Sequence, residues 1–336
     1  MLVVFLGLMI TVVVVFQNYQ NVFVSNVELN SDYKIFYVPT GSTYEEVKDK
    51  LGVENFLIDK KSFDWVAEKK EYSISVKPGR YKITNGMSNN ELINMLRAGN
   101  QDPVMLVFNN VRSFADLAGK VSKYIEPDSL ELLAHFTDSQ LPEKYGFKTE
   151  SFIGMFVPET YEFFWSSSPT DFTNRMSREY ETFWEKRDKK LNRLEMTREE
   201  ISTLASIVDE ETIHDDENEI VAGLYMNRLE KGMPLQADPT LKFAMGDFTI
   251  KRILNEDKQI DSPYNTYKFK GLPPGPITIP SVSALDAVLN YEKHNYIFMC
   301  AKSDFSGYHS FARNLKQHNK NAADYQKALN QKGIYR

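Results

Sequence analysis

Three adjacent carboxylates, Asp209, Glu210 and Glu211, end a segment whose apolar residues have helical spacing. On a helix, at about 100° per residue, those apolar side chains gather on one side. They are Ile201, Leu204, Ala205, Ile207 and Val208. Glu211 falls inside this apolar stripe, whereas Glu210 points to the opposite side and Asp209 lies at the margin. The spacing therefore predicts that one of the three carboxylates faces the protein interior.

A carboxylate among aliphatic neighbours loses hydration, which disfavours its charged form and raises its pKa. A carboxylic acid that keeps its proton near neutral pH is suited to donate that proton to a leaving oxygen. The other interpretation is structural, with a buried Glu211 paired to a basic residue such as Arg228. The helix by itself leaves both interpretations open.

Polar side chains that suit a sugar follow this helix. A second helix is predicted over 216–231, and Asn227 lies in its apolar seam, where it either makes structural hydrogen bonds or orients a catalytic group. In an extended segment Gln236 and Asp238 project on the same side, an arrangement that suits sugar hydroxyls. Asp238-Pro-Thr240 is also ordinary turn chemistry, so a structural role stays open.

Aromatic and conformationally restricted residues come next. The segment 262–267, Ser-Pro-Tyr-Asn-Thr-Tyr, offers ring faces and polar tips that suit carbohydrate, although an ordinary aromatic turn has the same composition. The Pro/Gly run 271–277 restricts several backbone angles and predicts a stiff wall. Strands at 296–301 and 308–311 predict a hairpin that carries His309, either near the cleft or in a structural hydrogen bond.

The elements that position these residues include two matching units, 38–51 and 83–96, which align at an offset of 45 residues. Each reads as a strand, a Gly turn and a helix that begins with a capping box, in which a hydroxyl and a Glu satisfy free amides. The pairs are Thr43 with Glu46, Ser88 with Glu91 and, before the helix that ends in Glu211, Thr197 with Glu200. We expect a small α+β module over residues 30–100.

The rest of the chain predicts mixed secondary structure, so the expected fold class is α+β. A strand at 103–108 and a mainly helical stretch form a connecting region over 101–195. A larger mixed domain over 196–336 contains the helix with Glu211, another helix near 282–291, the hairpin and a last helix.

The first sixteen residues are apolar apart from Gly7 and Thr11. A bilayer-spanning helix needs about 20 apolar residues, so either the true start lies upstream or the helix extends through 22–24. No charged start or small-residue cleavage site marks a cleaved signal peptide. We expect a single transmembrane anchor within residues 1–24, with the rest of the chain on the far side of the membrane.

Composition excludes several classes of function. The 40 basic and 46 acidic side chains give a net charge of −6 without a basic run, which argues against a nucleic-acid partner. The single cysteine, Cys300, excludes a disulfide framework and a cysteine-based zinc site, and we expect it to fill core space. The five histidines show no ligand spacing, so we expect no metal and no cofactor.

Five motifs occur in an order and at spacings that resemble one family. They are Ala205-Ser-Ile-Val-Asp-Glu-Glu-Thr212, Asn227-Arg-Leu229, Leu235-Gln-Ala-Asp-Pro-Thr240, Tyr264-Asn-Thr-Tyr267 and Gly271-Leu-Pro-Pro-Gly275, followed by Phe311 and His318-Asn319. The chain resembles the MltG/YceG-like endolytic murein transglycosylases over nearly its whole length. The resemblance implies an N-terminal anchor, a LysM-like module matching residues 30–100 and a C-terminal catalytic domain.

The activity implied by this resemblance is that of a lytic transglycosylase, which cleaves the β-1,4 bond between N-acetylmuramic acid and N-acetylglucosamine without water. The family's catalytic glutamate directly precedes the Thr of the helix motif, which makes it Glu211 here. It would protonate the glycosidic oxygen and then accept the proton of the muramic acid 6-hydroxyl, giving a 1,6-anhydro end. The implied role is to terminate nascent strands.

The resemblance also extends to the surroundings of Glu211. The expected substrate-binding residues are Gln236, Asp238, Thr240, Tyr264, Asn265, Thr266, Tyr267, His309 and Phe311, and the expected orienting residues are Asn227 and Asn319. The implied partners are peptidoglycan glycan strands, the membrane and cell-wall synthesis enzymes. The implied location is the cytoplasmic membrane, crossed once, with the catalytic domain on the periplasmic side.

Some positions depart from the family pattern. Asp209 replaces a Glu, which puts a role for that site in doubt, and Phe243 replaces a Tyr and so lacks its hydroxyl. The family's Glu-Gly and Pro-Asp-Thr become Ile153-Gly154 and Pro158-Glu159-Thr160. We expect these changes to tune substrate binding and to leave the chemistry of Glu211 intact.

Two other functions stay open. A lysozyme-type hydrolase needs two carboxylates beside the scissile bond, and Asp238 is the best candidate partner for Glu211. A non-catalytic wall-binding protein would hold glycan with the module at 30–100 and recruit synthesis enzymes with its C-terminal domain. The ends of the digestion products and the activity of a Glu211→Gln variant distinguish the three functions.

Overall fold

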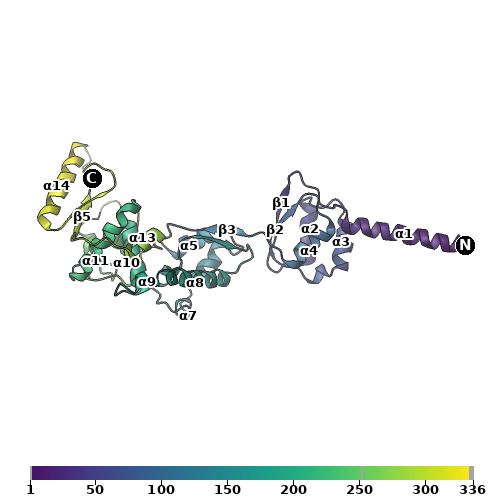
Figure 1. Ribbon diagram of the computed structural model, residues 1–336, viewed down its shortest axis with the longest axis horizontal. Helices are drawn as coiled ribbons and strands as arrows, with labels where there is room; N and C mark the ends of the chain where they lie inside the picture. Colours follow the sequence, from purple (N-terminus) through teal and green to yellow (C-terminus); the bar gives the residue numbers. More distant parts are fainter. Residues whose placement is uncertain (1, 251–252, 333–336) are drawn as a thin grey trace. The chain divides into compact units, whose positions relative to one another are not determined.

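The computed structural model describes residues 2–250 and 253–332, and across these residues helices are combined with three two-stranded sheets (Figure 1). This content confirms the α+β class. Met1 of the predicted anchor, and residues 251–252 and 333–336 of the predicted C-terminal domain, lie outside the described residues. The chain divides into two compact units, the first made of residues 1–106, 122–128 and 161–168 and the second of residues 107–121, 129–160 and 169–336.

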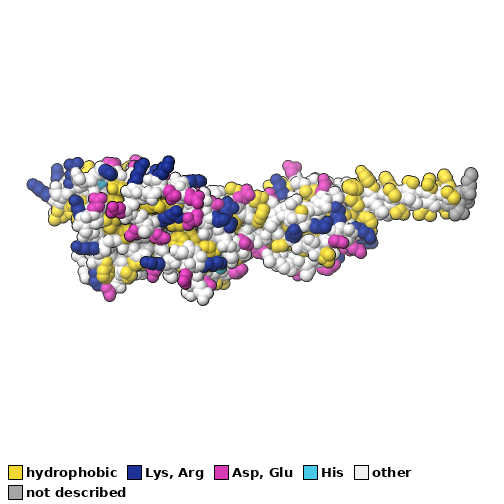
Figure 2. Space-filling model, turned by 60° about the horizontal axis from the view of Figure 1, so that its bottom comes forward, with side chains coloured by type: hydrophobic (Ala, Val, Ile, Leu, Met, Phe, Trp, Pro, Cys, Tyr) yellow, Lys and Arg dark blue, Asp and Glu magenta, His cyan; other side chains and the backbone are white. Residues whose placement is uncertain are grey.

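The N-terminal helix α1 (Leu2–Phe23) contains a stretch, Val4–Phe23, that is long and apolar enough to cross a membrane by its length and composition. At about 1.5 Å per residue, 20 residues span roughly the 30 Å thickness of a bilayer's hydrocarbon core. The helix continues through residues 17–21 and ends at Phe23, one residue short of the predicted extension through 22–24. Its apolar side chains are mostly exposed, and Figure 2 shows them along the helix.

The small α+β part of the first unit is built on one sheet, in which β1 (Tyr33–Val38) pairs antiparallel with β2 (Gly79–Thr84) and Phe36 lies opposite Tyr81. Its helices are α2 (Tyr44–Val53), α3 (Lys60–Lys69), η1 (Tyr72–Ile74) and α4 (Asn89–Ala98). The inward side chains of the strands and the apolar faces of the helices form one buried core. The apolar face of the sheet therefore packs against the apolar faces of the helices.

All three predicted capping boxes are confirmed. In each, the cap hydroxyl accepts a hydrogen bond from the amide three residues on, and the Glu carboxylate accepts one from the amide of the cap residue. The pairs are Thr43–Glu46, Ser88–Glu91 and Thr197–Glu200. A cap of this kind contributes about 1 kcal/mol and fixes where its helix begins. For the helix that ends in Glu211, a fixed start also fixes the side of the helix on which Glu211 lies.

The region between residues 101 and 195 is mainly helical, as predicted. Its elements are β3 (Val104–Val107), α5 (Phe114–Val121), α6 (Ser129–Phe136), α7 (Leu141–Lys144), η2 (Phe152–Met155), β4 (Thr160–Phe163), α8 (Pro169–Glu185) and α9 (Asp188–Leu191). Strand β3 pairs with β4. The rings of Phe136, Phe152 and Phe172 all contact Phe156, with centroids 5.5 to 6.1 Å apart, and form an aromatic core.

The helix with the three carboxylates is α10 (Arg198–Glu211), which packs against α11 (Asn218–Glu230) and α13 (Val282–Leu289). The other elements here are η3 (Asp215–Glu217), α12 (Asp238–Met245), η4 (Asp257–Gln259), the antiparallel hairpin of β5 (Phe298–Ala301) and β6 (His309–Ala312), and α14 (Leu315–Gln331). The predicted hairpin and last helix are confirmed. The hairpin brings residues far along the chain to the end of α10.

The Pro/Gly run 271–277 packs tightly, in agreement with the predicted stiff wall. The Ile277 amide donates to the Ser206 hydroxyl of α10 at 3.0 Å. A Cβ atom added at Gly275 would lie 1.9 Å from the carbonyl oxygen of Glu150. Only glycine at position 275 therefore lets the run approach the backbone of Glu150 so closely. The run contacts Glu150 at Gly275 and α10 at Ile277.

Gly275→Ala is therefore expected to lower the free energy of unfolding by about 2 kcal/mol, because the backbone must shift to relieve the clash. Urea unfolding followed by circular dichroism measures the change. Gly119→Ala is the matched control: a Cβ there meets nothing within 4 Å, and alanine favours the α5 helix. Equal unfolding midpoints for Gly275→Ala and wild type would contradict the close packing.

Candidate active site

A pocket of about 210 Å³ opens at the C-terminal end of α10. It is lined by residues from α10, α11, the segment leading into α12, the turn at 262–267 and the β5–β6 hairpin. These residues are Glu211, Leu224, Tyr225, Arg228, Leu235, Gln236, Asp238, Tyr267, Met299, Cys300, Ala301 and His309. A larger groove of about 1120 Å³ lies around the other end of α10, where Glu200 is committed to the capping box. The smaller pocket is the one that contains the inward carboxylate.

The three adjacent carboxylates separate as the helical spacing predicts. Glu211 lines the pocket. Glu210 lies elsewhere and forms a two-point contact with the Arg112 guanidinium at 3.1 and 3.2 Å. Asp209 accepts hydrogen bonds from the amide and hydroxyl of Ser281, the N-cap of α13, at 3.1 and 2.5 Å. Two of the carboxylates are thus held by structural partners, and Glu211 alone faces the pocket.

The pKa of Glu211 is raised to about 7, chiefly by burial, and the nearby Asp238 carboxylate acts in the same direction. Groups that act in the opposite direction are the Tyr225 hydroxyl, which donates to Oε1 of Glu211 at 2.6 Å, and the more distant charge of Arg228. Loss of hydration prevails, because no cation within residues 2–250 and 253–332 pairs directly with the carboxylate. Near neutral pH Glu211 is therefore present in both its acid and its carboxylate form.

Arg228 does not form the ion pair with Glu211 that the structural interpretation requires. Its side chain is 7% exposed, and its guanidinium donates to the carbonyl oxygens of Ile297 at 2.7 Å and Leu235 at 2.5 Å. The cation therefore joins α11 to two other segments of the pocket wall. Its charge still reaches Glu211 and favours the carboxylate, but without direct contact.

Gln236, Asp238 and Tyr267 come together in the pocket, although the segment 235–240 is not the extended strand that we predicted. Gln236 has a left-handed backbone with φ of 51°, and Asp238 begins α12. The Tyr267 hydroxyl donates to Asp238 Oδ1. A turn that leads into a helix thus presents both side chains, where the prediction relied on strand alternation.

Three predicted substrate-binding residues are instead buried. Thr240 is 0% exposed, and its hydroxyl bonds to the Ala237 carbonyl and to the Thr266 hydroxyl. The Asn265 side chain donates to the carbonyls of residues 258 and 260. The structure therefore shows Thr240, Asn265 and Thr266 buried, with side-chain hydrogen bonds that shape the turns.

Two aromatic residues of the prediction pack outside the pocket lining. Tyr264 lies against the ring of Phe243, with centroids 4.5 Å apart. Phe311 packs on Tyr296, with centroids 5.6 Å apart. Both rings stabilise neighbouring segments, so the sequence overestimated how many aromatic faces the pocket presents.

The two asparagines expected to orient catalytic groups also lie outside the pocket lining. Asn227 Nδ2 donates to the carbonyls of His294 and Tyr296 at 2.8 and 2.9 Å, which fixes the segment before β5. Asn319 is exposed on α14. The structural alternative for Asn227 is therefore the one observed.

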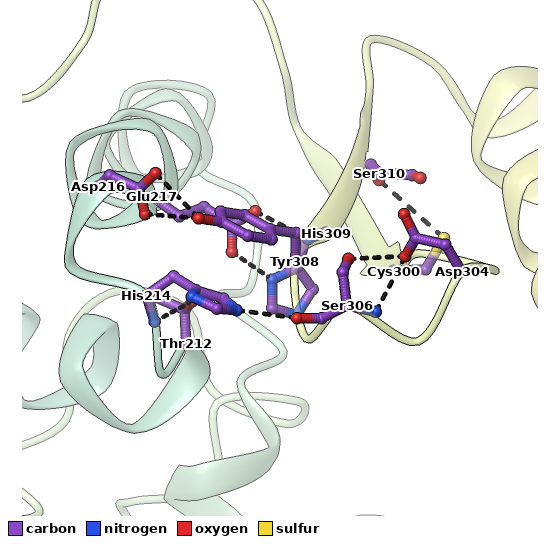
Figure 3. Close-up of polar contacts among 10 residues, drawn as sticks. All are labelled: Thr212, His214, Asp216, Glu217, Cys300, Asp304, Ser306, Tyr308, His309 and Ser310. Atoms are coloured by element: carbon purple, nitrogen blue, oxygen red, sulfur yellow. Dashed lines mark hydrogen bonds and ion pairs between the residues drawn. The ribbon is translucent and has the colours of Figure 1, made fainter.

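Sequence reasoning missed several pocket residues. Tyr225 was not identified, and Arg228 was considered only as a structural partner of Glu211; the two are three residues apart on α11 and so share a helix face, a spacing that could have identified Tyr225. Cys300 is partly exposed in the pocket wall and does not fill core space as predicted, because the hairpin leaves one of its faces open. Glu217 was also missed, and it holds His309 of β6 through two hydrogen bonds (Figure 3).

Comparisons with known proteins agree with this architecture. The sequence profile of the YceG-like family matches residues 36–324. The chain is 27% identical over 311 residues to the endolytic murein transglycosylase of Bacillus subtilis (strain 168), covering 88% of this chain and 85% of that protein. It is 26% identical over 318 residues to the endolytic murein transglycosylase of Streptococcus pneumoniae (serotype 2, strain D39), covering 86% of this chain but 57% of the pneumococcal protein.

A solved structure has the same fold. The crystal structure of a YceG-like protein of Listeria monocytogenes superposes with a TM-score of 0.58 at 24% identity, covering 86% of this chain and 98% of that one. Because the family profile spans most of the sequence, the chain belongs to the YceG-like family.

Proposed function

We propose that this chain is a membrane-anchored endolytic lytic transglycosylase that cleaves peptidoglycan glycan strands. The observation that carries the proposal is one carboxylic acid, Glu211, whose pKa is raised to about 7 in a pocket lined by hydrogen-bonding side chains. The names of the Bacillus subtilis and Streptococcus pneumoniae relatives support the same activity.

Glu211 serves first as acid and then as base. Its proton passes to the glycosidic oxygen, and the bond between that oxygen and C1 of the muramic acid residue breaks. The 6-hydroxyl oxygen of the same residue then bonds to C1, and its proton returns to the Glu211 carboxylate, which leaves a 1,6-anhydro end and consumes no water. A pKa of about 7 suits both steps, because neither form is strongly disfavoured at neutral pH.

Gln236 and Asp238 hold the sugar beside Glu211. Both side chains are exposed at the pocket, and they offer an amide and a carboxylate to sugar hydroxyls. The Tyr267 hydroxyl donates to Asp238 Oδ1, so it orients that carboxylate and leaves its other oxygen free to accept.

The proposal includes a location and a domain organisation, and the length and apolar composition of α1 support its membrane anchor. As a single span of the cytoplasmic membrane, it tethers the rest of the chain on the periplasmic side, where glycan strands lie. Residues 30–100 act as a LysM-like glycan-binding module, 101–195 as the connecting region and 196–336 as the catalytic domain. Contact with cell-wall synthesis enzymes directs cleavage to nascent strands, which are thereby terminated.

Hydrolysis is the second candidate function, because Asp238 places another carboxylate in the pocket of Glu211. The test is digestion of purified peptidoglycan by the full chain in detergent, with product masses read by mass spectrometry. Anhydro ends support transglycosylation, whereas reducing ends show hydrolysis. Absence of products would contradict the proposal and favour a non-catalytic wall-binding protein.

Tyr225→Phe is expected to move the alkaline limb of the pH–activity profile to higher pH. The Tyr225 hydroxyl lowers the pKa of Glu211, so its removal raises that pKa. The first step requires the protonated acid, and activity is lost as pH rises through its pKa. Initial rates of glycan cleavage between pH 5 and pH 9 measure the shift, and a limb that stays in place or moves to lower pH contradicts it.

A further inference from the structure

Glu217 is a buried carboxylate outside the chemistry described so far. It ends η3, its side chain is 4% exposed, and both of its oxygens accept hydrogen bonds from one residue of the hairpin. The backbone amide of His309 donates to Oε1 at 2.7 Å, and the Nδ1 atom of the His309 ring lies 2.7 Å from Oε2 (Figure 3). A carboxylate only accepts hydrogen bonds, so Nδ1 must carry a proton.

The other ring nitrogen of His309 is left for a ligand. The imidazole lines the same pocket as Glu211, Asp238 and Gln236. Within residues 2–250 and 253–332, no protein group forms a hydrogen bond with Nε2 of His309. In the uncharged form of the ring that carries its proton on Nδ1, Nε2 has a lone pair and accepts a hydrogen bond.

Neighbouring contacts hold His309 in this position. The preceding residue, Tyr308, donates its hydroxyl to Asp216, the residue before Glu217. His214 stacks on the Tyr308 ring with centroids 3.8 Å apart, and its Nε2 lies 3.0 Å from the Ser306 carbonyl oxygen. Figure 3 shows these contacts joining the start of β6 to the segment 212–217. Tyr308 and His309 of the hairpin thus form hydrogen bonds with Asp216 and Glu217, which follow α10.

We propose that Glu217 is a positioning residue, which fixes His309 so that Nε2 accepts a hydrogen bond from a hydroxyl of the sugar bound beside Glu211. This inference rests on the proposed glycan cleavage. The inference concerns the tautomer of the His309 ring. The buried Glu217 carboxylate holds the proton on Nδ1, so Nε2 is the acceptor and faces the pocket. The same arrangement of a carboxylate behind a histidine sets ring orientation at other catalytic sites.

Glu217→Gln tests the tautomer with little change in shape. A carboxamide has one acceptor oxygen and one donor NH2, and the His309 backbone amide still needs the oxygen. The NH2 group then faces Nδ1, which must become the acceptor, so the proton moves to Nε2. At Nε2 a donor replaces an acceptor, and the sugar hydroxyl loses its partner.

The experiment compares the full chain in detergent as wild type, Glu217→Gln, His309→Ala and the double variant. We expect each single change to lower kcat/KM for glycan cleavage about 10- to 100-fold, as the loss of an orienting partner commonly does. The double variant is expected to be no worse than His309→Ala, because Glu217 acts only through that ring. Losses that multiply in the double variant would show an independent structural role and overturn the proposal.

Two further measurements keep the outcome clear. The 15N NMR signals of His309 are expected to show a proton on Nδ1 in wild type and on Nε2 in Glu217→Gln; an Nε2 proton in wild type would overturn the proposal. Glu219→Gln, a change at an exposed α11 position outside the pocket lining, is expected to keep activity within twofold. If wild type cuts no glycan, the proposed function fails, while the NMR signals still decide whether Glu217 sets the tautomer.

Discussion

Replacing Glu211 with Gln is expected to lower the rate of glycan cleavage by about 10³-fold or more while the protein still folds. A positioned general acid or base contributes about 10²- to 10⁴-fold, and this carboxyl group serves in both steps of the proposed mechanism. Gln has nearly the same shape, and its carbonyl oxygen can still accept the Tyr225 hydroxyl, which now lies 2.6 Å from Oε1. The variant therefore removes the proton without removing the packing.

Stability provides an independent check on this variant. The pKa of Glu211 is higher in the folded protein than in the unfolded chain, so the folded state binds more protons between about pH 4.5 and pH 7. Stability conferred by the protonated form is lost as pH rises through this window. At pH 8 the wild-type protein must bury an ionised carboxylate, whereas Gln is uncharged. The variant is therefore expected to have a melting temperature at pH 8 no lower than that of wild type.

The matched control is Glu210→Gln, at the adjacent position. Glu210 pairs with the partly exposed Arg112, and loss of such a pair costs about 0 to 1 kcal/mol. We expect its activity to stay near that of wild type. Product masses from purified peptidoglycan measure both variants, and a Glu211→Gln variant with wild-type activity would refute the assignment of the acid.

Arg228→Met is expected to lower the free energy of unfolding by about 3 kcal/mol, because it leaves the buried carbonyl oxygen of Leu235 and the partly buried one of Ile297 without the guanidinium donor. These bonds join α11 to the segment before α12 and to the residue that precedes β5, so the pocket wall becomes less rigid when they are lost. The charge of Arg228 also favours the Glu211 carboxylate. Its loss raises the pKa of Glu211 and moves the alkaline limb of activity to higher pH.

Arg228→Lys separates the two effects. Lysine keeps the positive charge but lacks the planar set of donors that reaches two backbone segments. We expect Arg228→Lys to be destabilised nearly as much as Arg228→Met, with a smaller shift of the pH–activity profile. Urea unfolding and initial rates across pH measure the pair. A change in stability below about 0.5 kcal/mol for Arg228→Met would show that solvent readily replaces the guanidinium.

The parts of this site that the sequence predicts correctly depend on local periodicity. Thr197 and Glu200 fix the start of α10, and the spacing of its apolar residues then places Glu211 on the inward side. The capping box and the apolar spacing both lie within residues 197–211, so they can be read from one short segment. The same holds for the first unit, where capping boxes at Thr43 and Ser88 mark two helix starts.

The errors arise where tertiary contacts decide. Thr240 and Asn265 have side chains that suit either a sugar or a turn, and only the folded chain shows that the turn uses them. The left-handed backbone of Gln236 cannot be derived from strand alternation. Glu217 and His309 are 92 residues apart, so no local pattern links them before the hairpin folds against α11.

The most direct test of this account is the titration of the Glu211 carboxyl group itself. In the full chain with 13C-labelled glutamate side chains, the signal that disappears in Glu211→Gln identifies Glu211, and its chemical shift is followed across pH by NMR. We predict a midpoint at about pH 7, the value to which burial raises the pKa. A midpoint near 4.5, the ordinary value for this side chain, would show a permanently ionised carboxylate and contradict its role as the acid.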